Sequence, residues 1–129
     1  MKKIILDTNF LLIPIQFHVD IFTEIERICL FEYKLFIIDK TIRELNKIIN
    51  TQSRKHKEAA NVALMLIKKK GIELIKTEEG KVDDLIVGLL DKDSILATQD
   101  ALLRKRARAK GASVIFLRSK KYLMLNQGA

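Results

Sequence analysis

Carboxylate side chains occur in four separate segments of the chain, each beside a run of residues that could form a strand or a helix. These acids are Asp7, Glu44, the pair Asp83 and Asp84, and Asp100. If they converge they repel one another, because two unit charges about 4 Å apart cost roughly 4 kcal/mol at an effective dielectric constant near 20. Such a cluster stays ionised only when cations neutralise it; otherwise some of its members must be protonated. Oxygen donors without His or Cys favour Mg²⁺ or Mn²⁺, so the acids predict a site for one of these metals.

Each acid also has a purely structural interpretation at the start of a helix. Asp7, Asp83 and Asp100 fit the N-cap position, which Asp favours. Glu44 follows Thr41 by three residues, which is the spacing of a capping box. Capping alone does not explain why four acidic segments should meet at one rim of a sheet, so both interpretations stay open.

Five short apolar runs predict the strands that position these acids. The runs are uninterrupted rather than alternating, as is typical of a parallel sheet covered on both faces. They are Lys3–Leu6, Leu35–Ile38, Ile72–Ile75, Ile95–Ala97 and Val114–Leu117. Asp7 directly follows the first run and Asp100 lies just after the fourth.

Apolar residues at helical spacing occupy the intervals between the predicted strands. The helices are expected at Ile21–Cys29, Ile42–Ile49, about Arg54–Lys70, Leu85–Leu90 and about Leu102–Ala109. Gly71 and Gly111 follow two of them as C-terminal caps. The alternation predicts one α/β domain over residues 1–129, with a mostly parallel five-stranded sheet. Ligands of such sheets bind beyond the carboxyl ends of the strands, where the acids are expected.

The acidic motifs, taken in order, resemble those of a PIN domain over essentially the whole chain. The motifs are Ile4-Ile5-Leu6-Asp7-Thr8-Asn9, Glu44, Asp83-Asp84-Leu85-Ile86 and Thr98-Gln99-Asp100. The resemblance implies a three-layer α/β/α sandwich and a metal-dependent nuclease that cleaves RNA. It also implies roles for individual residues: Asp7, Glu44, Asp83 and Asp100 as catalytic metal ligands, Asp84 as an accessory ligand, and Asn9 and Thr98 as polar supports. Gln99 departs from the family pattern, which more often has Asn or Ser there.

The segment Pro14–Phe22 resembles the PIN subgroup that processes small-subunit ribosomal RNA in archaea and eukaryotes. The implied partners are therefore an RNA, in particular an rRNA precursor, and ribosome-assembly factors. Two alternatives stay open: a catalytically weak RNA-binding or ribosome-assembly module, and the toxin ribonuclease of a toxin–antitoxin pair, whose partner is an antitoxin. A homodimer is a further expectation from the resemblance.

Composition limits the class of protein and locates its charge. The 129 residues carry a formal net charge of +8 and one cysteine, Cys29, which excludes an internal disulfide. The cysteine usage and the lack of a long apolar run predict a cytoplasmic protein without a membrane segment. No Gly-rich phosphate loop is present, which argues against an NTP-dependent enzyme.

The whole excess of positive charge belongs to residues 101–129, which contain no acid. Five of these cations lie in the last predicted helix, and we expect them to form a phosphate-binding wall beside the metal site. They are Arg104, Lys105, Arg106, Arg108 and Lys110. The alternative is a solvated helix whose basic end has no binding role.

Overall fold

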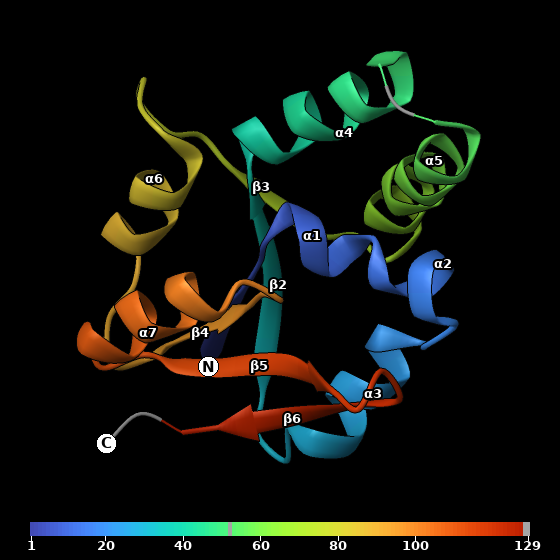
Figure 1. Cartoon of the computed structure of the whole chain (residues 1–129). Helices are drawn as coiled ribbons and strands as arrows, with labels where there is room; N and C mark the ends of the chain where they lie inside the picture. The colour runs from blue at the N-terminus through green and yellow to red at the C-terminus, as the bar shows by residue number, and fades with distance from the viewer. Residues whose placement is uncertain (52, 128–129) are drawn as a thin grey trace.

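A six-stranded sheet with the order β3-β2-β1-β4-β5-β6 forms the centre of the molecule (Figure 1). The computed structural model describes residues 1–51 and 53–127. The first five strands are mutually parallel, and β6 is antiparallel to β5. The strands are β1 (Lys2–Leu6), β2 (Tyr33–Ile38), β3 (Glu73–Ile75), β4 (Ser94–Ala97), β5 (Ser113–Arg118) and β6 (Tyr122–Asn126).

Helices cover both faces of this sheet, so the predicted three-layer α/β/α sandwich is confirmed (Figure 1). The helices are α1 (Thr8–Leu11), α2 (Ile13–Phe17), α3 (Ile21–Ile28), α4 (Asp39–Thr51), α5 (Arg54–Lys69), α6 (Val82–Gly88) and α7 (Ala101–Ala109). Ile4 and Leu6 of β1 pack toward α1–α5, whereas Ile5 between them packs toward α6 and α7. The unbroken apolar strands therefore bury their side chains on both faces.

All five predicted strands are present, and the structure adds elements that the sequence patterns did not predict. The sheet has a sixth strand, β6, rather than ending at five. The helices α1 and α2 span only four and five residues, which is too short to show a helical period. Gly71 and Gly111 adopt positive φ angles of 60° and 85° after α5 and α7, as expected of C-terminal caps.

The outer edge of β6 is covered in its middle by two side chains of α3. The Leu123 N–H donates to Glu24 Oε1 at 2.9 Å, and Arg27 Nη2 donates to the Leu123 carbonyl at 3.0 Å. Arg27 Nε also pairs with Glu24 at 2.9 Å. The backbone groups of Leu123 are thus satisfied by side chains instead of by a further strand.

The strand order reverses between β1 and β4, which makes the carboxyl ends of these two strands the topological switch point of the sheet. Leu6 is level with Ala97, and Ala97 is level with Ile115 of β5. Sheets of this kind bind their ligands beyond the carboxyl ends of the strands at such a point. None of the helices in the described ranges is long and apolar enough to span a membrane.

Candidate functional site

Asp7 lies at this switch point, directly after β1, and its side chain is buried. Its exposed fraction is 6%. Oδ1 accepts a hydrogen bond from the Thr8 N–H at 2.9 Å, and Oδ2 accepts one from the Thr98 hydroxyl at 2.7 Å. Burial raises the pKa of Asp7 to about 6, against the opposing effect of these two hydrogen bonds, and the charges of Asp83 and Glu44 raise it further. Asp83 and Glu44 therefore both lie within electrostatic reach of Asp7.

Thr98 connects the segments that leave β1 and β4. Its hydroxyl lies 3.2 Å from Asn9 Oδ1 as well as 2.7 Å from Asp7 Oδ2, and it accepts a hydrogen bond from the Asp100 N–H at 3.1 Å. Gln99 completes the connection, because its N–H donates to Asn9 Oδ1 at 3.1 Å and its Nε2 donates to the Asn9 carbonyl at 2.8 Å. The two predicted supports, Asn9 and Thr98, are thus brought together at Asp7. The family departure at Gln99 supplies one of these bonds, because only the bond from Nε2 comes from the Gln side chain.

Glu44 reaches the site from α4, where its Oε1 accepts a hydrogen bond from the Thr8 hydroxyl. The alternative interpretation of Glu44 as part of a capping box is wrong. The helix begins at Asp39, so Thr41 lies inside it, fully buried, and its hydroxyl has no hydrogen-bond partner within the described residues. Thr8 belongs to the motif that predicted the site, but its bond to Glu44 joins residues far apart in the chain.

A second polar cluster fixes the segment that follows β3 and that leads toward α6. Asp39 Oδ1 accepts hydrogen bonds from the Thr77 hydroxyl at 2.6 Å and the Thr77 N–H at 3.2 Å. The ammonium group of Lys40, which is buried, donates to the Thr77 carbonyl at 3.0 Å and lies 3.3 Å from Asp39 Oδ2. The hydrogen bonds from Thr77 hold the pKa of Asp39 down at about 2, and Lys40 contributes in the same direction. Sequence patterns gave no sign of this cluster.

The remaining predicted acids lie at the starts of α6 and α7. Asp83 and Asp84 occupy the first turn of α6, whose N-cap is Lys81, so the interpretation of Asp83 as an N-cap is wrong. Asp83 is exposed. Asp84 forms an ion pair with Arg106 of α7 at 2.8 Å. Asp100 is the N-cap of α7, as its structural interpretation predicted, and it uses only Oδ1 to accept from two backbone N–H groups.

The donor set at the switch point fits a hard divalent cation in its chemistry. Asp7, Glu44, Asp83 and Asp100 offer only carboxylate oxygens, and each comes from a different element. Within residues 1–51 and 53–127, no three acidic, His or Cys side chains stand close enough together to hold a metal as they are. The buried carboxyl of Asp7, whose pKa is raised by burial and by two acidic neighbours, is the group that a cation would stabilise in its ionised form.

The basic side chains that were predicted to form a wall on α7 do not all lie near the site, because the helix runs away from it. Arg104 lies near the site: its guanidinium stacks 4.8 Å from the Phe116 ring and its Nη1 lies 3.5 Å from the Thr98 carbonyl. Lys105 is exposed beside it, whereas Arg106 is paired with Asp84. Because α7 leads back to the start of β5, Arg108 and Lys110 lie toward the opposite edge of the sheet.

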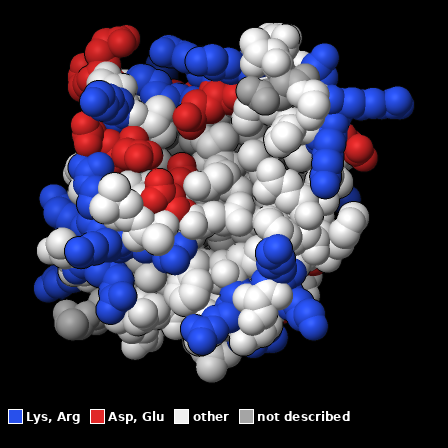
Figure 2. All heavy atoms as spheres, viewed as in Figure 1, with Lys and Arg blue, Asp and Glu red and all other residues white. Residues whose placement is uncertain are grey.

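Figure 2 shows how the charge is arranged on the face that Figure 1 presents. Acidic side chains gather on the upper left, over the region of α6, and Lys and Arg side chains lie below them over α7. A further group of basic side chains lies at the lower right, by the turn between β5 and β6. An uncharged surface separates this group from the acids.

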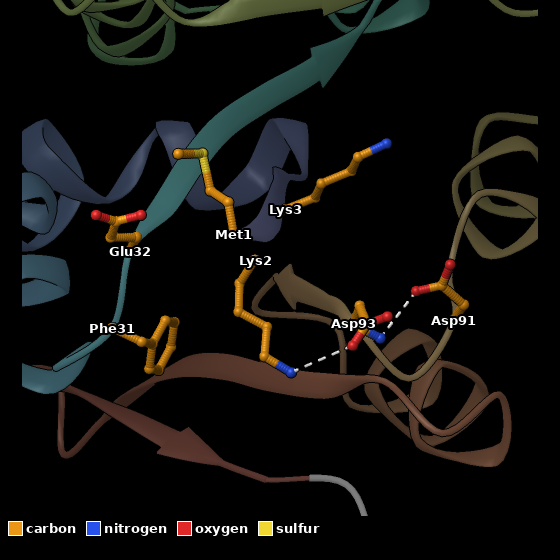
Figure 3. A pocket seen from close by; sticks show the side chains of 7 residues that line it. All are labelled: Met1, Lys2, Lys3, Phe31, Glu32, Asp91 and Asp93. Carbon is orange, nitrogen blue, oxygen red and sulfur yellow. Dashed lines mark hydrogen bonds and ion pairs between the residues drawn. The ribbon is translucent and has the colours of Figure 1, made fainter.

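A cleft lies away from these residues, at the amino ends of the strands. Its volume is about 670 Å³, and its lining includes Lys2, Lys3, Asp91 and Asp93 (Figure 3). Lys2 pairs there with Asp93 at 3.8 Å. Two of its three acids, Asp91 and Asp93, lie beside lysines, and ligands of doubly wound sheets bind at the other edge of the sheet. We therefore place the candidate site at the switch point.

The chain is similar to several known proteins. Residues 4–120 match the family described as a PIN like domain. Ribonuclease VapC4 of Methanocaldococcus jannaschii is 29% identical over 124 residues, which cover 95% of each chain. The structure of the PIN domain endonuclease Utp24 has a TM-score of 0.78 at 22% identity and covers 97% of this chain and 91% of that chain. A domain of a functionally unknown protein from M. jannaschii has a TM-score of 0.59 at 22% identity, with 92% and 93% covered. Both structures share the fold.

Proposed function

The chain belongs to the PIN-like domain family, and on that premise we propose that it is a metal-dependent endoribonuclease that hydrolyses RNA phosphodiester bonds as a single domain over residues 1–129. The observation that carries the proposal is Asp7, a buried carboxyl at the switch point whose pKa is raised by burial and by the charges of Asp83 and Glu44. A cation bound beside such a carboxyl would favour its ionised form and offset the cost of burying its charge. The similarity to a ribonuclease supports RNA as the substrate.

We assign the metal to Asp7, Glu44, Asp83 and Asp100, with Asp84 as an accessory ligand. The exposed Asp83 and the second carboxylate oxygen of Asp100 can turn toward Asp7 without breaking a hydrogen bond described above. Mg²⁺ or Mn²⁺ bound there would act as a Lewis acid on the phosphodiester group.

The chain's own residues orient these ligands. Thr98 fixes Asp7 Oδ2, Thr8 fixes one oxygen of Glu44, and Asn9 holds the segment that carries Thr98. Arg104 and Lys105 place positive charge at the same end of α7, where a phosphate of the substrate would lie.

For the substrate we propose an rRNA precursor, on the basis of the Pro14–Phe22 segment, with ribosome-assembly factors as partners. The second candidate within the family is a toxin ribonuclease, which the similarity to ribonuclease VapC4 favours equally. The two differ in their genomic neighbourhood, because a toxin requires a small antitoxin gene beside it. A homodimer fits either role.

A non-catalytic RNA-binding module is a third candidate, and one observation favours it. The acids of the described residues do not converge closely enough to hold a metal without side-chain movement. Manganese binding separates the candidates, since a module without a working site would not bind the ion at the switch point.

The proposal is tested by incubating labelled RNA with the protein and Mn²⁺ or Mg²⁺. We expect internal cleavage that EDTA abolishes. Asp7→Asn and Asp100→Asn should each reduce the rate by at least about 100-fold, because loss of even an outer-shell partner costs roughly 10- to 100-fold. Asp93→Asn, at the opposite edge of the sheet, is the matched control and should cleave normally. Undiminished cleavage by Asp7→Asn would remove the assignment.

A further inference from the structure

The strand β5 extends beyond the level of the candidate site. Ile115 is level with Ala97, and the Thr98 N–H donates to the Ile115 carbonyl at 3.1 Å, so Thr98 stands about level with Phe116. The strand continues through Leu117 to Arg118, about 7 Å further at roughly 3.3 Å per residue. Because β1, β4 and β5 are parallel, this extension rises from the same edge of the sheet as Asp7.

Three cations stand at the end of this extension. Arg118, Lys120 and Lys121 are all exposed, and we call them together the basic turn. By strand alternation, Arg118 lies on the same face of β5 as Phe116, against which Arg104 stacks at 4.8 Å. Figure 2 shows basic side chains at the lower right, where Figure 1 places this turn. Positive charge therefore lies near the site at Arg104 and again at the basic turn, across an uncharged surface from the acids.

The backbone of the turn is held in a conformation that its residues do not favour. Ser119 and Lys120 have φ angles of 54° and 58°, and the Lys121 N–H donates to the Arg118 carbonyl at 3.0 Å. This is the geometry of a two-residue hairpin turn in which Asn-Gly is preferred. A left-handed backbone costs roughly 1–2 kcal/mol per residue for residues other than Gly. Unfavourable backbone of this kind is concentrated at functional positions, and here it keeps a lysine at the tip.

The basic side chains of α7 that follow Lys105 are less suited to contact a substrate at the site. Arg106 is neutralised by Asp84 at 2.8 Å. Gly111, which follows α7, approaches Lys92 in the segment before β4, at the amino edge of the sheet. Arg108 and Lys110 immediately precede Gly111 and so lie at that edge as well.

From these observations we infer that the basic turn binds the phosphate backbone of single-stranded RNA and holds it beyond the site, with Arg104 nearer the acids. This inference rests on the proposed function and names the surface on which the substrate lies. Tyr122 supports a single strand as the ligand: it faces Arg118 across the hairpin and is 41% exposed, so its ring is available to stack on an unpaired base. An acidic protein would use the cations but not the ring.

The test is direct binding of a fluorescein-labelled single-stranded oligouridylate in EDTA, followed by anisotropy across a range of salt concentrations. The variant Arg118→Gln/Lys120→Gln/Lys121→Gln is compared with Lys2→Gln/Lys34→Gln/Lys92→Gln, which removes the same charge from the amino edge of the sheet. Each phosphate contact contributes about 0.7 to the slope of log affinity against log salt, so the basic-turn variant should lose about 2 from the slope. The control should keep the slope of the parent.

Tyr122→Ala should weaken binding about tenfold, as expected for loss of one stacked base, whereas Tyr122→Phe should bind normally. Equal loss of slope in the two lysine-and-arginine variants would overturn the inference. So would a loss produced by Arg108→Gln/Lys110→Gln instead, an absence of RNA binding by the parent, or equal displacement of the RNA by polyglutamate. Cleavage of the same oligonucleotide with Mn²⁺ is measured separately. If the protein cleaves the oligonucleotide but the salt slope of RNA binding is the same in the parent and the basic-turn variant, this inference is overturned and the proposed function stands.

Discussion

Replacing Asp7 by Asn should stabilise the metal-free protein at neutral and alkaline pH, although it removes the central residue of the site. Burial raises the pKa of Asp7 from its usual 3.8 to about 6. Since the folded state holds the proton more tightly than the unfolded state, ionised Asp7 destabilises the fold, and this cost grows as the pH rises from 3.8 through 6. A difference of about two pKa units corresponds to roughly 3 kcal/mol at 1.36 kcal/mol per unit.

The hydrogen bonds around Asp7 tolerate the amide. The Asn oxygen can accept from the Thr8 N–H, as Oδ1 does at 2.9 Å. The Asn NH₂ would then face the Thr98 hydroxyl, which can accept from it and turn its own proton to Asn9 Oδ1, now 3.2 Å away. We therefore expect Asp7→Asn to raise the free energy of unfolding by about 1–3 kcal/mol at pH 8, where the upper value is the full cost of the ionised carboxyl. The gain should fall toward zero near pH 4.

Urea unfolding in EDTA at a series of pH values measures this difference. Glu58→Gln, an exposed position on α5, is the control and should show little change at any pH. In Mn²⁺ the order should reverse, because an ion that binds only the folded parent stabilises it in proportion to the logarithm of its concentration. A difference between parent and Asp7→Asn that is the same at pH 4 and pH 8 would refute the reasoning, since burial of the charge would then not be its cause.

Three further predictions concern residues around the site. Lys120→Gly should raise the free energy of unfolding by about 1 kcal/mol, because Gly adopts φ 58° without strain, and it should lower the salt slope of RNA binding by about 0.7. Urea unfolding and fluorescence anisotropy on the same sample measure the two effects. A less stable variant would show that the backbone of Lys120 is not strained. Asp39→Asn should destabilise the protein at pH 7, and this loss of stability should shrink as the pH falls through about 2, since a group with a lowered pKa stabilises the fold only while it is ionised. The unfolding midpoint measured across a range of acidic pH values tests this. A loss of stability that does not depend on pH would show that the charge of the carboxylate is not its cause. Thr8→Val should reduce the rate of Mn²⁺-dependent cleavage about tenfold, because it releases Glu44, whereas Thr8→Ser keeps the hydroxyl and should cleave at the rate of the parent. Equal rates in the two variants would show that the hydroxyl does not position Glu44 for cleavage.

The architecture was predictable because its signals are local. Uninterrupted runs such as Ile4–Leu6 predict buried parallel strands, and a parallel strand determines on which edge the following acid must lie. Asp7 and Asp100 could therefore be placed near each other from the sequence. The strand β6, Tyr122–Asn126, was not among the five expected strands, and it is the one antiparallel strand of the described sheet.

The contacts within the site depend on pairings between distant residues, which sequence patterns do not reveal. The bond between Thr8 and Glu44 joins α1 to α4, and the ion pair between Asp84 and Arg106 joins α6 to α7. From the sequence alone, Glu44 fits a capping box as well as a metal site, because its partner Thr8 is not visible there. The positive charge of the last helix was likewise evident in the sequence. Only the direction in which α7 runs relative to the sheet shows that Arg104 lies near the site and Lys110 does not.

The side chains that cover Leu123 affect how copies of the protein can meet. A strand at the edge of a sheet offers its free N–H and C=O groups to any extended chain, which is a common route to aggregation. Glu24 and Arg27 occupy these groups in the middle of β6, so an added strand would have to displace a paired glutamate and arginine before it could form a continuous ladder. The last strand of the sheet therefore terminates growth of the sheet, and loss of Arg27 should be seen first as a tendency to aggregate at high concentration.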